Sequence, residues 1–267
     1  MRFSKLWMAV FISVGASCAC AQASVGAGAE FTTGKYGGTE STQELYLPFT
    51  GKLQTGLWSF KLTVPYLVVS GPANVIGGGE DRIPIDSSGS GSGGSSGFSD
   101  AGSATRTTSG LGDIVARASY SLLQETSSAV GLDVGARVKF GTADEAEGLG
   151  TGETDLSLQA DLYKPLGAAT LFATLGYRWY GDPPGIELRD VPYFAVGASY
   201  RLGGDTAFGL AYDYRPHIVD GGLSISEVSL YWSRRFAREW KLQLYAIVGL
   251  SDGSPDVGVG SFLEYQL

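Results

Sequence analysis

The sequence predicts an all-β chain that closes into a transmembrane, antiparallel, up-and-down β-barrel of about twelve strands. Three observations predict this fold. Apolar and polar residues alternate along one segment after another, which is the period of a strand with two unlike faces. Short and long connectors alternate between the segments, and the number of segments is even, as in outer-membrane barrels. None of the segments repeats its apolar residues at helical spacing.

The composition excludes several other classes of protein. The net charge of -8 argues against a nucleic-acid partner, because phosphate is bound mainly by Lys and Arg. The 2 Cys both precede residue 21, so neither a disulfide framework nor a zinc cluster is expected. Gly accounts for 40 of 267 residues, roughly twice its usual share, and no motif for a cofactor accompanies it.

The N-terminus has the order of a secretory signal peptide. Arg2 and Lys5 precede an uncharged apolar run over residues 6–16, and small residues of the A-x-A type follow. We expect residues 1–21 to be removed after Ala21, with Ala23 as the alternative, and the chain to be exported through the periplasm. Lipidation at Cys18 or Cys20 is a second alternative. Residues 22–267 then form a single barrel domain.

The clearest strand covers residues 240–251, where Trp, Leu, Leu, Ala, Val and Leu occupy the even positions and mostly polar or small residues the odd ones. The same alternation appears in every segment of the barrel domain. The predicted strands are 24–34, 41–50, 56–70, 110–123, 128–141, 152–164, 169–181, 192–202, 205–215, 224–236, 240–251 and 257–267.

The alternation leaves open which face points inward. A soluble sandwich or a lipocalin-like barrel would bury the apolar face. Two features favour an apolar face that points to lipid: the polar face is rich in Gly and in charges of both signs, as a wet lumen would be, and the aromatic residues lie near strand ends. The aromatics expected at the membrane interfaces are Trp58, Tyr66, Trp179, Trp232 and Trp240.

The register places as many bases as acids inside the barrel, nine of each. Fourteen of them are predicted to line the pore: Lys61, Asp113, Arg117, Asp133, Arg137, Lys139, Asp155, Asp161, Arg178, Arg201, Asp213, Arg215, Glu227 and Arg235. The other four are Glu30, Glu44, Lys241 and Glu264. Opposed charges can create a narrow selective channel. In a barrel of this size they can also pair across the bore and plug it.

The long loops at the outer mouth carry most of the excess negative charge, and Glu80, Asp81 and Arg82 are assigned to them. Such a rim could attract cations, hold divalent ions that bridge it to lipopolysaccharide, or simply be solvated. The longest loop, residues 71–109, includes an uninterrupted Gly/Ser tract over residues 87–97. It is either a lid or constriction that folds over the mouth, or a mobile surface loop.

Catalytic residues are hard to find. The single His, His217, has no Ser one or two places away in sequence, and Asp213 lies four residues before it. A hydrolase that uses this pair is the most distant of the functions considered, and no metal site is expected.

Several motifs resemble a family of bacterial outer-membrane proteins named for the MetA pathway of phenol degradation. They are Leu-Thr-Val-Pro-Tyr-Leu-Val-Val-Ser-Gly at 62–71, Ser-Gly-Leu-Gly-Asp-Ile at 109–114 and Gly-Thr-Gly-Glu-Thr-Asp-Leu at 150–156. The resemblance implies an outer-membrane barrel, loosely linked to the uptake of aromatic or other hydrophobic compounds. It brings no catalytic residues.

The predicted function is passive passage of small, hydrophobic or aromatic solutes through a charged lumen. The alternative is a non-conducting structural or surface-interaction barrel. The expected partners are outer-membrane lipid and lipopolysaccharide, the solute, and the barrel-assembly machinery. That machinery would bind the C-terminal strand, which ends in Leu267 instead of the usual aromatic residue.

Overall fold

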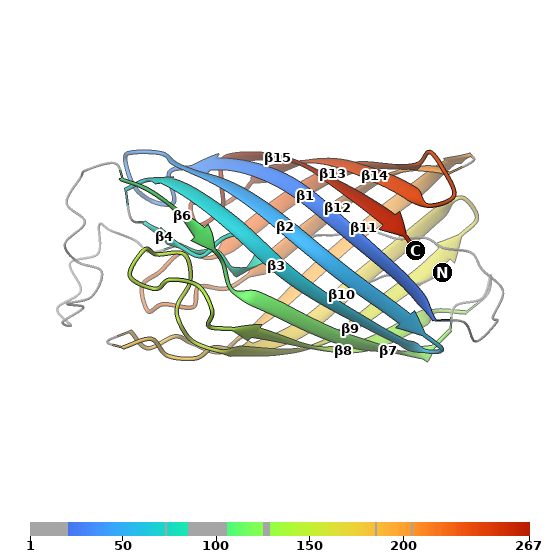
Figure 1. Cartoon of the computed structure of the whole chain (residues 1–267), viewed down its shortest axis with the longest axis horizontal. Helices are drawn as coiled ribbons and strands as arrows, with labels where there is room; N and C mark the ends of the chain where they lie inside the picture. The colour runs from blue at the N-terminus through green and yellow to red at the C-terminus, as the bar shows by residue number, and fades with distance from the viewer. Residues whose placement is uncertain (1–20, 73, 85–105, 125–128, 185, 204) are drawn as a thin grey trace.

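The protein is a closed β-barrel of twelve strand lines (Figure 1). The computed structural model describes residues 21–72, 74–84, 106–124, 129–184, 186–203 and 205–267. Every strand pairs antiparallel with its neighbours, and β1 closes the barrel by pairing with both β2 and β15. The predicted signal peptide, apart from Ala21, lies outside the described residues. The first strand begins at Gln22.

The twelve predicted strands are confirmed, with shifted ends. The strands of the barrel are β1 Gln22–Gly34, β2 Thr42–Thr55, β3 Trp58–Gly71, β6 Arg106–Leu111, β7 Ile114–Leu123, β8 Gly131–Phe140, β9 Asp155–Leu166, β10 Ala169–Trp179, β11 Val191–Gly203, β12 Thr206–Arg215, β13 Ile225–Arg235, β14 Trp240–Gly249 and β15 Val257–Gln266. β6 and β7 are two pieces of one strand line that both pair with β3.

Exposure alternates along the strands with the predicted period of two. Leu210 is 52% exposed whereas its neighbour Ala211 is 1% exposed, and Val248 at 50% follows Ile247 at 2%. In water, each outward Leu or Val would forgo about 1.5–3 kcal/mol of burial, so this surface requires lipid. Among the described residues, no helix has the length and apolar character needed to cross a membrane.

Aromatic side chains gather at both ends of the barrel. The ring centroids of Trp58 and Tyr120 lie 5.0 Å apart, and those of Trp240 and Tyr265 lie 4.8 Å apart, both pairs close to the short turns. At the opposite end the centroids of Tyr177 and Trp179 are 5.0 Å apart. Among the other predicted interface aromatics, Tyr66 is 36% exposed and Trp232 is half-buried.

Tyrosine rings cover part of the glycine-rich lumen wall. Cross-strand pairs place Tyr231 opposite Gly209 and Tyr245 opposite Gly260, and each ring lies over its glycine. Tyr163, Ala211 and Tyr231 form a buried cluster inside the barrel. Rings from the adjacent strand therefore cover these glycines on the inner wall.

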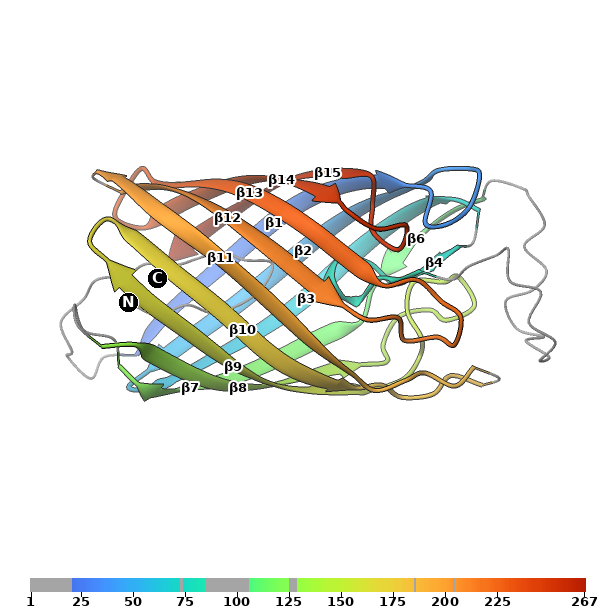
Figure 2. The same cartoon turned by 180° about the vertical axis from the view of Figure 1, so that it is seen from behind.

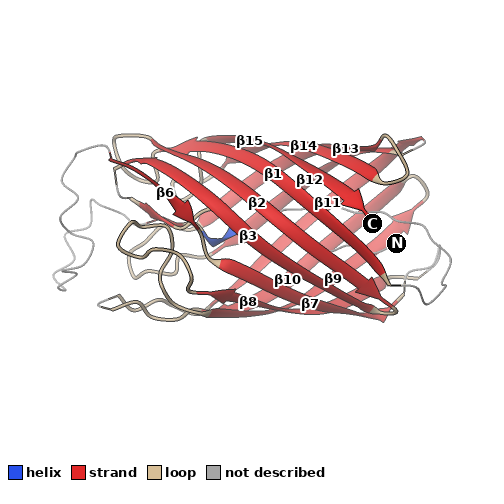
Figure 3. Ribbon diagram, viewed as in Figure 1, coloured by secondary structure: helices blue, strands red, loops and turns tan. Residues whose placement is uncertain are grey.

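The two ends of the barrel differ as predicted (Figures 1 and 2). The start of β1, the end of β15 and the tight turns, such as those at residues 56–57 and 167–168, lie at one end, called here the short-turn end. The long connectors lie at the other, the long-loop end. The loop predicted over 71–109 is shorter than expected, because β3 continues to Gly71 and β6 begins at Arg106. Figure 3 shows a short helical turn inside this end, η1 (Gly79–Asp81), preceded by β4 (Val75–Ile76) and followed by β5 (Ile83–Pro84).

The assignment of faces can be tested at two adjacent residues of β14. Leu244 is 44% exposed and points to lipid, whereas Gln243 is buried and lines the interior. We expect Leu244→Arg to destabilise the barrel by about 2–4 kcal/mol, the usual penalty for a lipid-facing Arg near the midplane. Gln243→Arg should cost less. Urea unfolding in lipid vesicles measures both, and equal effects would contradict the assignment.

The covered glycines make a second prediction. A Cβ added to Gly209 would lie 2.0 Å from Cζ of Tyr231, whereas one added to Gly51 would meet nothing within 4 Å. Gly209→Ala should therefore destabilise the folded barrel by about 1–3 kcal/mol through overpacking, and Gly51→Ala should not. The readout is the temperature at which the heat-modifiable band is lost on a gel. A neutral Gly209→Ala would show that the ring is free to move away.

Candidate functional site: a hairpin docked in the lumen

Residues 74–84 form a hairpin that enters the barrel from the long-loop end, and we call it the plug. β4 and β5 pair antiparallel, with Ile76 opposite Ile83. Both isoleucines are buried, in a cluster with Tyr180, Val191 and Ile218 of the barrel wall and outer loops. The aliphatic residues that flank the tip thus anchor the plug, and the tip, residues 77–82, projects into the lumen.

Three consecutive glycines allow the tip to fit. Gly77 and Gly79 have φ of +69° and +61°, a conformation that L side chains rarely adopt. Gly78 lies against the wall, where a Cβ would approach Cδ2 of Leu67 to 2.3 Å. The backbone N–H of Gly79 donates a 2.8 Å hydrogen bond to Glu44. The glycine run therefore brings the following charged residues to the middle of the bore.

Arg82 of the plug faces an acidic wall made by β1, β2 and β13. Its Nε donates to Oε2 of Glu44 at 2.9 Å, and its terminal nitrogens lie 3.6 Å from Glu30 and 3.8 Å from Glu227. The Arg82 side chain is only 2% exposed. A buried guanidinium is strongly destabilising without partners, so these carboxylates are what allow Arg82 to remain here.

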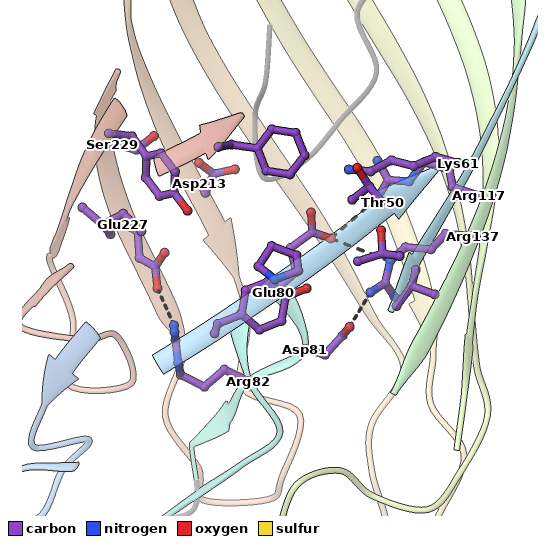
Figure 4. A pocket seen from close by; sticks show the side chains of 18 of the residues that line it. Thr50, Lys61, Glu80, Asp81, Arg82, Arg117, Arg137, Asp213, Glu227 and Ser229 are labelled. Carbon is purple, nitrogen blue, oxygen red and sulfur yellow. Dashed lines mark hydrogen bonds and ion pairs between the residues drawn. The ribbon is translucent and has the colours of Figure 1, made fainter. Parts of the chain in front are cut away.

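Glu80 and Asp81 face the opposite, basic wall (Figure 4). Arg137 donates to Asp81 at 2.6 Å and Arg178 donates to it at 3.2 Å. Glu80 lies 3.6 Å from Arg117 and 3.7 Å from Arg137. Burial alone would raise the pKa of the Asp81 carboxyl, but the two guanidinium groups hold that pKa well below its usual value. Asp81 thus stays ionised throughout the physiological pH range.

Arg215 of β12 fixes the backbone of the tip between these walls. Its guanidinium donates to the carbonyl oxygens of Glu80, at 3.1 Å, and of Arg82. It also donates to the hydroxyl of Tyr180 at 3.2 Å. The plug is therefore bound by side-chain charge on two sides and through its main chain on a third.

A cavity of about 200 Å³ extends from the plug tip toward the short-turn end. Its wall combines basic side chains with aromatic ones, among them Tyr46, Tyr193, Tyr245 and Phe262. Seven bases and five acids line it, which gives a net charge of +2 with the plug docked. The bases are Lys52, Lys61, Arg82, Arg117, Arg137, Arg178 and Arg215, and the acids are Glu80, Asp81, Asp213, Glu227 and Glu264.

The structure brings half of the predicted pore-lining residues to this cavity. They are Lys61, Arg117, Arg137, Arg178, Asp213, Arg215 and Glu227. Arg235 lines a second, smaller cavity of about 40 Å³ near the short-turn end.

The remaining predicted residues are not among those that line the main cavity. Asp113 accepts from the backbone of residues 142 and 143, and Lys139 binds Asp113 and Asp155 near the long-loop end. Asp133 accepts from Ser121 and Tyr163, and Asp161 accepts from Thr174. Arg201 of β11 is half-buried. These contacts fix the wall and the outer loops.

The prediction that Glu80, Asp81 and Arg82 lie at the outer mouth is wrong, because all three lie inside the barrel. Strand periodicity could not find them, since the plug belongs to a connector. One signal was present in the sequence: three glycines directly before three charged residues, with apolar residues on both sides. A charged tip between apolar flanks is unusual for a solvated loop.

The metal site and the hydrolase considered from the sequence can be compared with the structure. Among the residues that the structure describes, no group of three or more His, Cys, Asp or Glu could hold a metal ion. His217 lies half-buried in the loop after β12, where its ring contacts Arg189 at 3.0 Å.

The comparisons with known proteins agree with this architecture. The model of the family described as "Putative MetA-pathway of phenol degradation" matches residues 21–223. The chain belongs to this family. A search of curated proteins found no match.

Two solved structures resemble this member of the phenol MetA family. An outer membrane channel from Pseudomonas putida F1 superposes with a TM-score of 0.66 at 15% identity, covering 96% of this chain and 100% of the channel. The KdgM porin gives 0.50 at 10% identity, covering 91% of this chain and 98% of the porin. At these identities the likeness establishes the fold: a transmembrane barrel of the kind that outer-membrane channels adopt.

The plug makes a third prediction. Asp81→Asn removes the carboxylate that contacts Arg137 and Arg178 most closely, which should destabilise the docked plug by about 3–5 kcal/mol and loosen it. The probe is Ile83→Cys, because Ile83 is 3% exposed and residues 21–267 contain no Cys. We expect a water-soluble maleimide to label this thiol faster when Asp81→Asn is added.

The matched control is Asp220→Asn, which removes the ion pair with Arg189. That pair is exposed at the surface, so its loss should leave the labelling rate unchanged. Equal labelling with and without Asp81→Asn would mean that its charge does not hold the plug.

Proposed function

We propose that this protein is an outer-membrane channel for passive passage of small solutes, closed at rest by the plug and opened when the plug undocks. The observation that carries the proposal is the cavity on the far side of the plug tip, inside a closed barrel, with charged side chains on its wall. The fold of the two solved structures supports the same role.

The location and partners follow from the proposed role. The lipid-facing Leu and Val residues and the aromatic end zones fit the outer membrane, with the short-turn end in the periplasm. The C-terminal strand β15 would be the element that engages the barrel-assembly machinery. The loops of the long-loop end would meet lipopolysaccharide. The family description, which refers to phenol degradation, supports aromatic compounds as the solutes.

A non-conducting barrel is the second candidate, and one observation favours it. The plug tip is held by ion pairs to opposite walls of the bore, and such a network could be permanent. Conductance separates the two candidates.

The fourth prediction is therefore a planar-bilayer measurement on the refolded protein. Wild type should show small or infrequent openings, and the triple variant Glu80→Gln, Asp81→Asn, Arg82→Gln should show larger or more frequent ones. The triple variant keeps the length of the plug and removes its charges. The control is the double variant Arg106→Gln, Glu147→Gln, which removes an exposed ion pair of the outer loops.

A separate deletion of residues 87–97, which lie outside the described residues, tests whether that tract contributes a lid of its own. Openings that change with this deletion alone would place the closing element outside the plug. Silence in wild type and in every variant, with folding confirmed by heat-modifiability, would favour the non-conducting barrel.

A further inference from the structure

A row of positively charged side chains, interrupted at Ser157, crosses the inner wall of the barrel. The pairing register places Lys52 opposite Lys61, Lys61 opposite Arg117, and Arg117 opposite Arg137. One strand further, Ser157 pairs with both Arg137 and Arg178. Directly opposed residues on neighbouring strands lie on the same face, so these side chains all point into the lumen. We call Lys52, Lys61, Arg117, Arg137 and Arg178 the basic row.

The basic row lowers the stability of the sheet that carries it. Each directly opposed pair of like charges is destabilising, by roughly 0.2–1 kcal/mol relative to neutral residues. Three such contacts follow one another here, so the row requires a counter-charge. Glu80 and Asp81 of the plug supply it for Arg117, Arg137 and Arg178. The plug thus presents two carboxylates to the row as a bound anion would.

Two members of the row have hydrogen-bond donors or positive charge that no described residue satisfies. Arg137 is 2% exposed, yet its Nε and Nη1 have no hydrogen-bond acceptor among the described residues. Lys61 likewise has no ion-pair partner within 4.0 Å in the part of the chain that the structure describes. Both residues line the cavity. The buried Nε and Nη1 of Arg137 are costly without acceptors, and they point to an acceptor that arrives with a ligand. The half-buried Lys61 places a second positive charge beside the same cavity.

The remainder of the cavity indicates what that ligand carries. Tyr46, Tyr245 and Phe262 also line it, which provides apolar contact area for a ring. The volume of about 200 Å³ is below the roughly 300–1,000 Å³ of pockets for drug-sized molecules, so a single ring is the appropriate size. The net charge of the cavity lining also favours an anion. It is +2 with the plug docked and rises to +3 once Glu80, Asp81 and Arg82 leave the cavity.

We propose that the basic row is a binding site for the carboxylate of a single-ring aromatic acid, and that this carboxylate competes with Glu80 and Asp81 for the row. Arg137 donates to the carboxylate, Lys61 draws it inward from the short-turn side, and the aromatic wall receives the ring. A solute bound in this way weakens the hold on the plug. The inference rests on the proposed channel function and names its substrate class.

The test is a binding measurement, so that it stands apart from conductance. Isothermal titration of the full refolded protein in detergent would use benzoate as the probe and benzyl alcohol as its uncharged counterpart. Benzoate should bind at least about tenfold more tightly than benzyl alcohol, because only the carboxylate accepts charge-assisted hydrogen bonds. Inorganic phosphate serves as an anion without a ring and should bind more weakly than benzoate.

Two variants place the binding at the row. Lys61→Gln should weaken benzoate binding at least about tenfold. Its matched control, Lys164→Gln, makes the same change at the opposite face of the wall near the short-turn end and should leave affinity unchanged. Glu80→Gln with Asp81→Asn should tighten benzoate binding, because the internal competitor has lost its charge.

The outcomes separate the two proposals. Equal affinity for benzoate and benzyl alcohol, or no loss in Lys61→Gln, would overturn the carboxylate site even if the triple plug variant conducts. Equal affinity for phosphate and benzoate would overturn the aromatic part of the assignment. Benzoate binding in a protein that never conducts would support the site and contradict the channel.

Discussion

The backbone hydrogen bonds of the closed sheet are the constraint on which the rest of the structure depends. In lipid no water is present to pair with a free N–H or C=O, so a spanning sheet must have no open edge. The pairing of β1 with β15 removes that edge. Closure also fixes the size of the lumen, because strand number and tilt set the radius. Every later feature, from the covered glycines to the plug, is packing inside this fixed space.

Within that space the charges are sorted. Arg82 meets carboxylates of β1, β2 and β13, whereas Glu80 and Asp81 meet guanidinium groups of β7, β8 and β10. The tip of the plug is therefore a small dipole aligned in a bore whose walls carry opposite charge. Alignment of this kind specifies one docked orientation, since rotating the tip would bring like charges together. The buried aliphatic anchors, Ile76 and Ile83, then supply the apolar part of the contact.

The strand content of this chain could be predicted from sequence because period-two alternation is a local signal. The facing of Leu244 and Gln243, for example, follows from position alone. The site could not be predicted to the same extent. Glu80, Asp81 and Arg82 lie in a connector, and no local rule states whether a connector folds over a mouth or into it. The basic row was equally out of reach, because it depends on the register between strands distant in sequence, such as Lys61 with Arg117.

The plug is attached to the wall that it contacts. The end of β3 at Gly71 and the tip at Gly77 are separated by only five residues, so the acidic pair cannot diffuse away from the basic row. Its effective concentration there is set by that short, anchored connector and does not fall on dilution. Any free anion that competes for the same cations must approach this concentration. Below this concentration a solute anion would leave the plug docked. The fraction of barrels with solute bound would therefore follow the solute concentration outside the cell.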